Sequence, residues 1–426
     1  MLGNEISDFK KLKAIRNKIA DDTYKKVVLK GLYYCGSKVL GGDAIHSVAL
    51  VANNKTARFY GNTSCKSPWC CPVCTARQMS RYAGRIAAAL DALKDTHHAA
   101  MITFTIPHTR DFNCHEATEI LYNVWKAFTV HGNTVLATAK TDIFSNFMAA
   151  TESKHRVRAC EYTWGQSGWH PHFHCLFWFP KKHFDKIIDW EERLKERWLE
   201  LCKRYTIRQL LSRYPETQRK TVKAQVVTRV NIMYSKLNEG SHAVYISKDS
   251  EGKPIVQKSS SYLCGWGGDK EITGNVNEKA TAEGHYSWQE ILTLAVDTDD
   301  DKWWNLYFEY AMTTRKVRHT RVHFSVHSGL CKIIAEHINC EGYKTVLKKN
   351  ATSLEDKFGK WRLVCWFSAI TWQGIYEKCL QPEIMKFGIN GEINKIDELL
   401  ERNDLPKSIP KDSAAGRVTL KWLEAA

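Results

Sequence analysis

The chain has 426 residues, a formal net charge of +16 and a pI of about 9.1, which favours an anionic partner such as nucleic acid. No apolar run reaches the roughly 18 residues of a membrane span, and residues 1–26 lack the apolar core of a secretory signal. We therefore expect a cytoplasmic protein with no membrane partner and with its 14 cysteines reduced.

The first part of the chain divides into a polar segment, a cysteine-bearing segment and a helix. Residues 1–30 are expected to form an exposed helical lead-in, and residues 31–74 to mix short strands and turns. Residues 76–96 carry apolar side chains at helical spacing on one face. A second face of this helix is basic, and it is either a phosphate-contacting stripe or a solvated surface: Arg77, Arg81 and Arg85.

The middle of the chain has strands and helices in the order β-α-β-β-α-β. Asn113 and Glu116 are placed to cap the first helix, and Gly165 to Gly168 form a hairpin signal between two β-forming runs. This order predicts a ferredoxin-like antiparallel sheet with both helices on one face and the other face free for a site. The expected elements are a strand at 98–106, a helix after residue 113, strands at 156–164 and 169–179, a helix at 181–205 and a strand at 225–234.

Three histidines alternate along the second strand of the expected hairpin. Because alternate residues of a strand share a face, His170, His172 and His174 project to the same side. A hairpin that turns about the glycine-bounded loop places Glu161 directly opposite His172, with Cβ atoms roughly 4.5–5.5 Å apart. Two imidazoles and a carboxylate predict a catalytic metal site, whereas rings that merely pack on a sheet would not need the carboxylate. For His170, three roles stay open: ligand, supporting group or DNA contact.

Cysteines cluster in the N-terminal part of the chain. Cys71 and Cys74 form a Cys-x-x-Cys knuckle, Cys65 lies six residues before it, and Cys35 lies further upstream. Four thiolates suit a tetrahedral structural zinc ion. The alternative is a small core of reduced cysteines.

Three segments together resemble the plasmid rolling-circle replication initiators of the HUH (His-hydrophobe-His) endonuclease superfamily. Gly168-Trp-His-Pro-His-Phe-His-Cys-Leu176 resembles the HUH motif, Phe104-Thr-Ile-Pro-His108 the family's first motif, and residues 35–77 its N-terminal cysteine module. The resemblance implies an α+β protein with an HUH core and a zinc-binding cysteine module. It also implies that the additional thiol of Cys70 is not one of the zinc ligands, with substitution of Cys70 for Cys65 or Cys71 as the alternative.

The resemblance further implies a tyrosine nucleophile. Tyr262-Leu-Cys-Gly-Trp-Gly-Gly-Asp-Lys-Glu-Ile-Thr273 is similar to the family's Tyr-x-x-Lys-Trp-Gly segment followed by Glu-Leu-Thr, except that Gly265 replaces the lysine. Tyr245-Ile-Ser-Lys248 keeps the lysine and lacks the rest, so we favour Tyr262 and keep Tyr245 as the alternative. Glu271 is a candidate for activating water in the release step.

The function that the resemblance implies is initiation of rolling-circle replication. Glu161, His172 and His174 would hold Mg²⁺ or Mn²⁺ at the scissile phosphate, and Tyr262 would form a 5′-phosphotyrosine that is later rejoined. The implied partners are a single-stranded or cruciform DNA origin of a plasmid-like replicon, a host helicase and a polymerase. Imidazoles suit zinc or manganese better than magnesium, so the metal stays open.

Other functions and a division into three segments complete the expectations. The alternatives are a metal-dependent nuclease without a covalent step, a DNA-binding regulator with an inactive site, and a single-tyrosine transposase. We expect an N-terminal region with the zinc module and the basic helix at 1–96, the nicking and joining domain at 97–335 and a C-terminal accessory region at 336–426. Residues 181–223 carry 13 basic against 7 acidic side chains with interleaved tryptophans, which is typical of single-stranded DNA binding.

Overall fold

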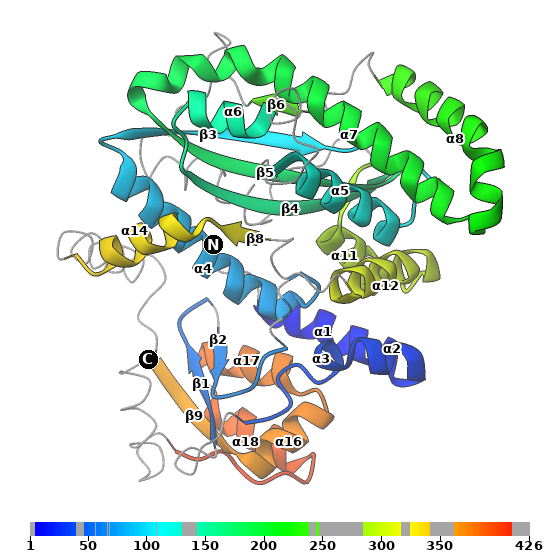
Figure 1. Cartoon of the computed structure of the whole chain (residues 1–426). Coiled ribbons are helices and arrows are strands. Elements are labelled where there is room, and N and C mark those ends of the chain that lie inside the picture. Colours follow the sequence, from blue (N-terminus) through cyan, green and yellow to red (C-terminus); the bar gives the residue numbers. More distant parts are fainter. Residues whose placement is uncertain are drawn as a thin grey trace. The chain divides into compact units, whose positions relative to one another are not determined.

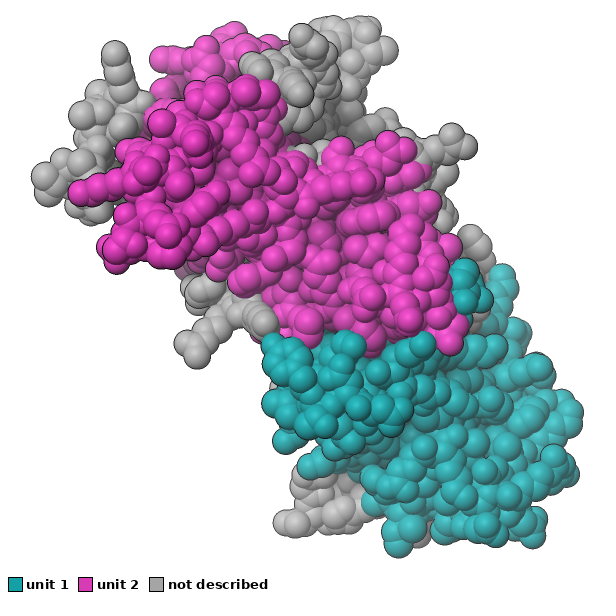
Figure 2. Space-filling model, turned by 90° about the vertical axis from the view of Figure 1, so that its right-hand side faces the viewer, with its two compact units in different colours: residues 1–78, 296–298, 341–426 teal, residues 79–295, 299–340 magenta. Residues whose placement is uncertain are grey.

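The computed structural model shows an α+β protein with two antiparallel sheets (Figure 1). The chain divides into two compact units, which Figure 2 colours separately. Unit 1 comprises residues 1–78, 296–298 and 341–426, and unit 2 comprises residues 79–295 and 299–340. The structure describes residues 5–39, 47–55, 57–65, 67, 69–107, 109–129, 143–237, 244–246, 284–316, 324–340 and 362–410. None of the helices in these ranges is both long enough and apolar enough to cross a bilayer.

Unit 1 is built on a three-stranded sheet in the order β2-β1-β9. Its strands are β1 (Ser47–Ala52), β2 (Ala57–Tyr60) and β9 (Arg362–Ser368). β9 pairs along the whole of β1, so a late segment of the chain completes a sheet that an early segment begins. The expected C-terminal region at 336–426 is therefore not a separate body: its described part from β9 onward folds into one unit with the N-terminal residues.

The helices of unit 1 pack around this sheet. They are α1 (Glu5–Ala20), α2 (Thr23–Val28), α3 (Lys30–Tyr33), α16 (Ala369–Glu377), α17 (Gln381–Asn390) and α18 (Ile393–Glu401). The prediction of a helical lead-in is confirmed, but its exposure was wrong: α1 buries Phe9, Leu12, Ile15 and Ile19. This apolar stripe packs near α17, a helix more than 360 residues away in sequence, so no local pattern could identify its partner.

Unit 2 contains the larger sheet, in the order β6-β3-β5-β4-β7, with β8 also paired to β4. The strands β3, β4 and β5 confirm the three strands expected before residue 180, and β4 and β5 form the expected hairpin with a turn at Gln166-Ser167. Gly168 has φ +92°, and a Cβ there would lie 3.1 Å from the carbonyl oxygen of Thr109, so the turn requires glycine. The six strands are β3 (His97–Thr105), β4 (His155–Gly165), β5 (Gly168–Pro180), β6 (Val244–Ile246), β7 (Tyr286–Ser287) and β8 (Phe324–Val326).

Helices α5, α6 and α7 lie on one side of this sheet (Figure 1). Phe104 of β3 contacts Trp125 and Phe128 of α5 and Trp198 of α7, with ring centroids 4.9–5.5 Å apart. Since strand residues alternate, this aromatic core leaves Thr103 and its cross-strand partner His174 on the opposite face. The helices with residues in unit 2 are α4 (Pro72–Leu93), α5 (Cys114–Thr129), α6 (Ile143–Ala150), α7 (Glu191–Ser212), α8 (Glu216–Leu237), α11 (Trp288–Thr298), α12 (Asp301–Lys316) and α14 (Ser328–Ile338).

Two of the expected elements differ in the structure. The strand expected at 225–234 is wrong, because these residues belong to α8 and the strand comes later, as β6. The β-branched run suggested a strand, but Val226, Val230 and Tyr234 are buried at a spacing of four, and the Tyr234 hydroxyl bonds Thr206 of α7 at 3.0 Å. The helix expected at 181–205 begins as a 3₁₀-helix (Lys181–Trp190) and becomes α-helical only at Glu191.

The capping box of α5 should contribute measurably to stability. The backbone N–H of Glu116 donates to Asn113 Oδ1 at 2.9 Å, and the backbone N–H of Asn113 donates to the Glu116 carboxylate at 3.1 Å. We expect Asn113→Ala to lower the free energy of unfolding by about 1 kcal/mol in urea titrations. Lys126→Ala, at an exposed site in the same helix, serves as the control and should change it by less than about 0.5 kcal/mol. Equal losses in the two variants would contradict the capping account.

Candidate metal centres

The β4–β5 hairpin brings one carboxylate and two imidazoles together. Glu161 pairs directly with His172, as the sequence predicted, and His174 pairs with Ala159 on one side and Thr103 on the other. Glu161 Oε2 lies 3.2 Å from His172 Nε2 and 2.9 Å from His174 Nε2, and the two Nε2 atoms are 3.2 Å apart. Three potential ligand atoms therefore converge on one point of the sheet face that lies opposite the aromatic core.

Hydrogen bonds behind the cluster orient both imidazoles. Nδ1 of His172 donates to the backbone carbonyl of His170 at 3.2 Å, since a carbonyl can only accept. With Nδ1 donating, Nε2 of His172 and the carboxylate attract each other only when a proton or a metal cation lies between them. Thr103 Oγ1 lies 3.0 Å from His174 Nδ1 and holds that ring from the neighbouring strand.

The spacing of the three atoms fits a shared divalent ion. Ligand atoms bonded at about 2.1 Å and at right angles to one ion lie about 3.0 Å apart, close to the 2.9–3.2 Å observed here. Three protein ligands leave further coordination positions for water or other oxygen ligands. The side chains of Glu161, His172 and His174 keep 20%, 11% and 8% of their surface exposed, so the cluster is partly accessible to solvent.

The charge state of the carboxylate suits a cation. Burial raises the pKa of Glu161, but the hydrogen bonds and charges of His172 and His174 outweigh burial and hold this pKa well below its usual range. Glu161 is therefore ionised at neutral pH and can act as an anionic ligand.

His170 lies beside the cluster and is not part of the three-atom group. Its ring stacks on that of His172, with centroids 4.9 Å apart, and its backbone carbonyl orients that ring. Sequence reasoning missed Thr103, because its contact with His174 depends on the pairing of β3 with β5. The only sequence signal for Thr103 was its place in the expected strand, directly before the Phe104-to-His108 motif.

A second centre lies in unit 1, where four cysteine sulfurs meet. The Sγ atom of Cys74 lies 3.5 Å from that of Cys35 and 3.4 Å from that of Cys65, and the Cys71 and Cys35 sulfurs are 3.6 Å apart. In a tetrahedral zinc site with bonds of about 2.3 Å, neighbouring sulfurs are about 3.8 Å apart. The four cysteines named from the sequence are thus brought together with a spacing that fits such an ion, whereas Cys70 is buried outside the group.

Segments from both ends of the chain support the cysteine loop. Arg16 of α1 donates to the backbone carbonyl of Cys35 at 2.7 Å and lies over the ring of Tyr376 at 3.9 Å. The indole N–H of Trp372 donates to the backbone carbonyl of Gly36 at 2.9 Å, and the Tyr376 hydroxyl donates to the backbone carbonyl of Tyr33 at 2.6 Å. Two residues of α16 therefore hold the turn that carries the first cysteine, which gives the C-terminal part of the chain a structural role.

Proton sharing in the cluster favours thiolate formation at one sulfur. Hydrogen bonds from Cys35, Cys65 and Cys71 lower the pKa of the Cys74 thiol, while burial raises that of Cys71. A metal ion would replace these shared protons, because thiolates rather than thiols bind zinc.

The remaining residues named from the sequence are only partly described. Arg77, Arg81 and Arg85 all lie on α4, and Arg85 contacts Cys331 Sγ at 3.6 Å, but the side chains of the other two are outside the described residues. Tyr262 and Glu271 also lie outside the described residues, as does His108 of the first motif. The backbone of Tyr245 forms part of β6 and pairs with Thr103.

Comparisons with protein-family models, with curated proteins and with solved structures found no match for this chain. The functional interpretation therefore depends on the geometry and chemistry of the sites themselves.

Removal of the hydroxyl behind His174 should weaken metal binding. Thr103→Val keeps the side-chain volume and deletes the contact with Nδ1, and we expect the dissociation constant for Mn²⁺ in isothermal titration to rise by about 10- to 100-fold. Thr228→Val on the exposed side of α8 is the matched control and should bind like the wild type. An unchanged constant for Thr103→Val would show that this contact does not orient the ligand.

Two adjacent cysteines provide a test of the sulfur centre. Cys71→Ser should lose most of the bound zinc, measured as zinc per chain after dialysis, because it removes one of four thiolate ligands. Cys70→Ser should retain one zinc per chain, since Cys70 lies outside the four-sulfur group. If Cys71→Ser retained its zinc and Cys70→Ser lost it, Cys70 rather than Cys71 would be the fourth ligand.

Proposed function

We propose that this protein nicks one DNA strand through a covalent tyrosine link and later rejoins it, as an initiator of rolling-circle replication of a plasmid-like replicon. The observation that carries the proposal is the convergence of Glu161, His172 and His174 within 3.2 Å on paired strands. This is the ligand set that the HUH resemblance implies, with coordination positions left for phosphate oxygens.

The order of strands in unit 2 supports an HUH core. The chain runs from β3 through α5 and α6 to β4 and β5, then through α7 and α8 to β6. In the sheet these strands lie in the order β6-β3-β5-β4, which is the spatial order of a ferredoxin-like β-α-β-β-α-β unit. Helices α5, α6 and α7 cover the face opposite the histidines (Figure 1), and α14 contacts the histidine face near His155 at the far end of β4. The part of the histidine face around Glu161 is where we place a substrate strand.

The residues of the cluster would prepare the scissile phosphate for attack. A bound Mg²⁺ or Mn²⁺ would polarise the phosphate and offset the charge that develops on its oxygens. Thr103 and the His170 carbonyl keep the imidazoles in the orientation that such binding needs. The ionised Glu161 supplies the negative charge that favours a cation at this position.

The strand transfer itself is balanced without a further reactant. The hydroxyl oxygen of Tyr262 forms a bond to phosphorus and loses its proton, while the bond from phosphorus to the 3′-oxygen breaks and that oxygen gains a proton. The free 3′-hydroxyl can prime DNA synthesis. Because the 5′-phosphotyrosine keeps the energy of the broken phosphodiester bond, the 3′-hydroxyl of a DNA strand can later attack it and rejoin the DNA. Glu271 is proposed to activate water in the final release, and Tyr245 is the alternative nucleophile.

Positive charge on α8 supports a nucleic-acid partner. This helix carries four exposed basic side chains, Arg219, Lys220, Lys223 and Arg229, and its one acidic residue is Glu216. Such a surface suits DNA phosphates. The basic stripe of Arg77, Arg81 and Arg85, a structural zinc ion at the four cysteines, and a host helicase and polymerase as partners complete the proposal.

Formation of a covalent adduct tests the proposal. Purified protein would be incubated with Mn²⁺ and single-stranded plasmid or phage DNA, and protein-linked DNA would be located by mass spectrometry. We expect an adduct on Tyr262 that is lost in Tyr262→Phe, is retained in Tyr245→Phe, and falls by at least about 100-fold in His172→Ala, because deleting a metal ligand removes the phosphate activation.

Each other outcome selects a different function. An adduct on Tyr245 would keep the reaction and move the nucleophile. Metal-dependent cleavage that persists in both tyrosine variants and leaves no adduct would indicate a nuclease without a covalent step. Binding of DNA without any cleavage would indicate a regulator.

A further inference from the structure

A cavity of about 540 Å³ lies at the tip of the β4–β5 hairpin, within unit 2. We call it the tip pocket. It is lined by residues 110–113 of the loop after β3, by Trp164, Gly168 and Trp169 of the hairpin, and by Glu116, Arg213 and Glu309. Its size suits one nucleotide rather than an extended polymer.

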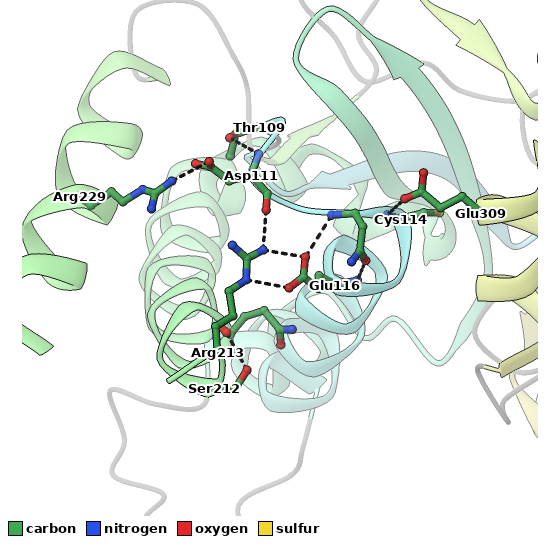
Figure 3. Close-up of polar contacts among 10 residues, drawn as sticks. Thr109, Asp111, Cys114, Glu116, Ser212, Arg213, Arg229 and Glu309 are labelled. Carbon is green, nitrogen blue, oxygen red and sulfur yellow. Dashed lines mark hydrogen bonds and ion pairs between the residues drawn. The ribbon is translucent and has the colours of Figure 1, made fainter. Parts of the chain in front are cut away.

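Ion pairs fix the wall of this pocket (Figure 3). Arg213 at the end of α7 donates to both carboxylate oxygens of Glu116, at 2.9 and 2.7 Å, and Arg229 of α8 pairs with Asp111 at 2.6 Å. The guanidinium of Arg110 donates to the Gln166 carbonyl at 2.6 Å. Because Arg213 is satisfied within the wall and three carboxylates line the cavity, the pocket disfavours a phosphate and accepts an uncharged group.

The hairpin side of the pocket is aromatic. Trp164 is half-exposed and also contacts Trp303 and Tyr286, with ring centroids 6.0 and 6.3 Å away, and the Lys302 ammonium lies 5.5 Å from its ring centre. Trp169 is buried, and its indole N–H has no hydrogen-bond partner in the described structure. Flat rings beside cations are the surface on which unpaired bases stack.

Glu309 gives the pocket a means of distinguishing bases. One of its oxygens accepts the backbone N–H of Cys114 at 2.6 Å, at the start of α5. A carboxylate has further lone pairs that can accept from the exocyclic amino group of adenine, cytosine or guanine. Thymine has no amino group and offers a carboxylate only its ring N3–H, so we expect it to bind less well.

The pocket lies close to the metal cluster along the same strand. Trp164 follows Glu161 by three residues, which is about 10 Å of strand. An odd separation places the two side chains on opposite faces of the sheet. A DNA strand whose phosphate lies at Glu161 would have to pass the hairpin tip to place a base in the pocket, and that base would leave the stack.

We propose that the tip pocket receives one unstacked base of the bound DNA strand, near the scissile phosphate, and selects the strand at that position. The inference rests on the proposed function, because it assigns the sequence preference of the same site to Trp164 and Glu309.

Abasic oligonucleotides test this directly. Fluorescence anisotropy would measure binding of the full chain to a single-stranded oligonucleotide in EDTA. The oligonucleotide spans the mapped nick or, if no nick is found, comes from the same plasmid or phage DNA. One abasic site is placed at each position of the oligonucleotide in turn. We expect wild-type affinity to fall about 10-fold or more at one position near the nick, the size expected from loss of one base–aromatic stack.

The variants separate the pocket from general DNA binding. Trp164→Ala should bind the intact oligonucleotide about as weakly as the wild type binds the abasic one, with no further loss at that position and unchanged losses elsewhere. Trp164→Phe should restore part of the difference. Glu309→Gln should reduce the difference in affinity between oligonucleotides with thymine and those with another base at that position. Trp190→Ala, which changes a tryptophan that packs on Phe147 away from the pocket, should leave the position-specific loss intact.

Two results would overturn the inference. One is an abasic scan of the wild type without a position-specific loss. The other is a Trp164→Ala protein that keeps that loss in full. Because binding in EDTA needs no cleavage, a protein that never nicks but shows the Trp164-dependent position supports the pocket and refutes the proposed reaction. A protein that forms the tyrosine adduct but shows no Trp164-dependent position supports the proposed reaction and refutes the role of the pocket.

Discussion

Pairing of β4 with β5 in a single register places Glu161 opposite His172 and keeps His174 on the same face. A shift by one residue would turn the histidines toward the face that Phe104 and Phe173 occupy against Trp125. The aromatic core therefore specifies the register, since only one pairing buries the phenylalanines and presents the ligand atoms together. Packing on one face of the sheet thus determines the chemistry available on the other.

The same hairpin links two levels of recognition in the proposed reaction. Its middle carries the ligand atoms that would engage a phosphate, and its tip carries Trp164, which lines the pocket proposed to receive a base. Hydrogen bonds from β3 and from the hairpin's own backbone hold the imidazoles, and the Arg213–Glu116 pair holds the pocket wall. The cysteine centre is held independently, by α1 and α16 of unit 1.

Sequence reasoning predicted the local features of this protein better than its long-range ones. The hairpin, the α5 cap and the four-cysteine group depend on spacing within short segments, and the structure brings these residues together as expected. The burial of α1 and the pairing of β9 with β1 depend on partners more than 300 residues away, which no periodicity reveals. In α8, β-branched residues predicted a strand, but burial at a spacing of four against α7 makes the segment helical.

The register of the β4–β5 hairpin is proposed to build a divalent metal site. Anomalous diffraction from crystals of the full chain soaked in Mn²⁺ tests it most directly. We expect a strong peak about 2.0–2.2 Å from Glu161 Oε2, His172 Nε2 and His174 Nε2, the usual bond length for such ligands. Ordered side chains at the hairpin with no peak between them would contradict this site, whereas a separate peak at the four cysteines is expected from the structural zinc ion.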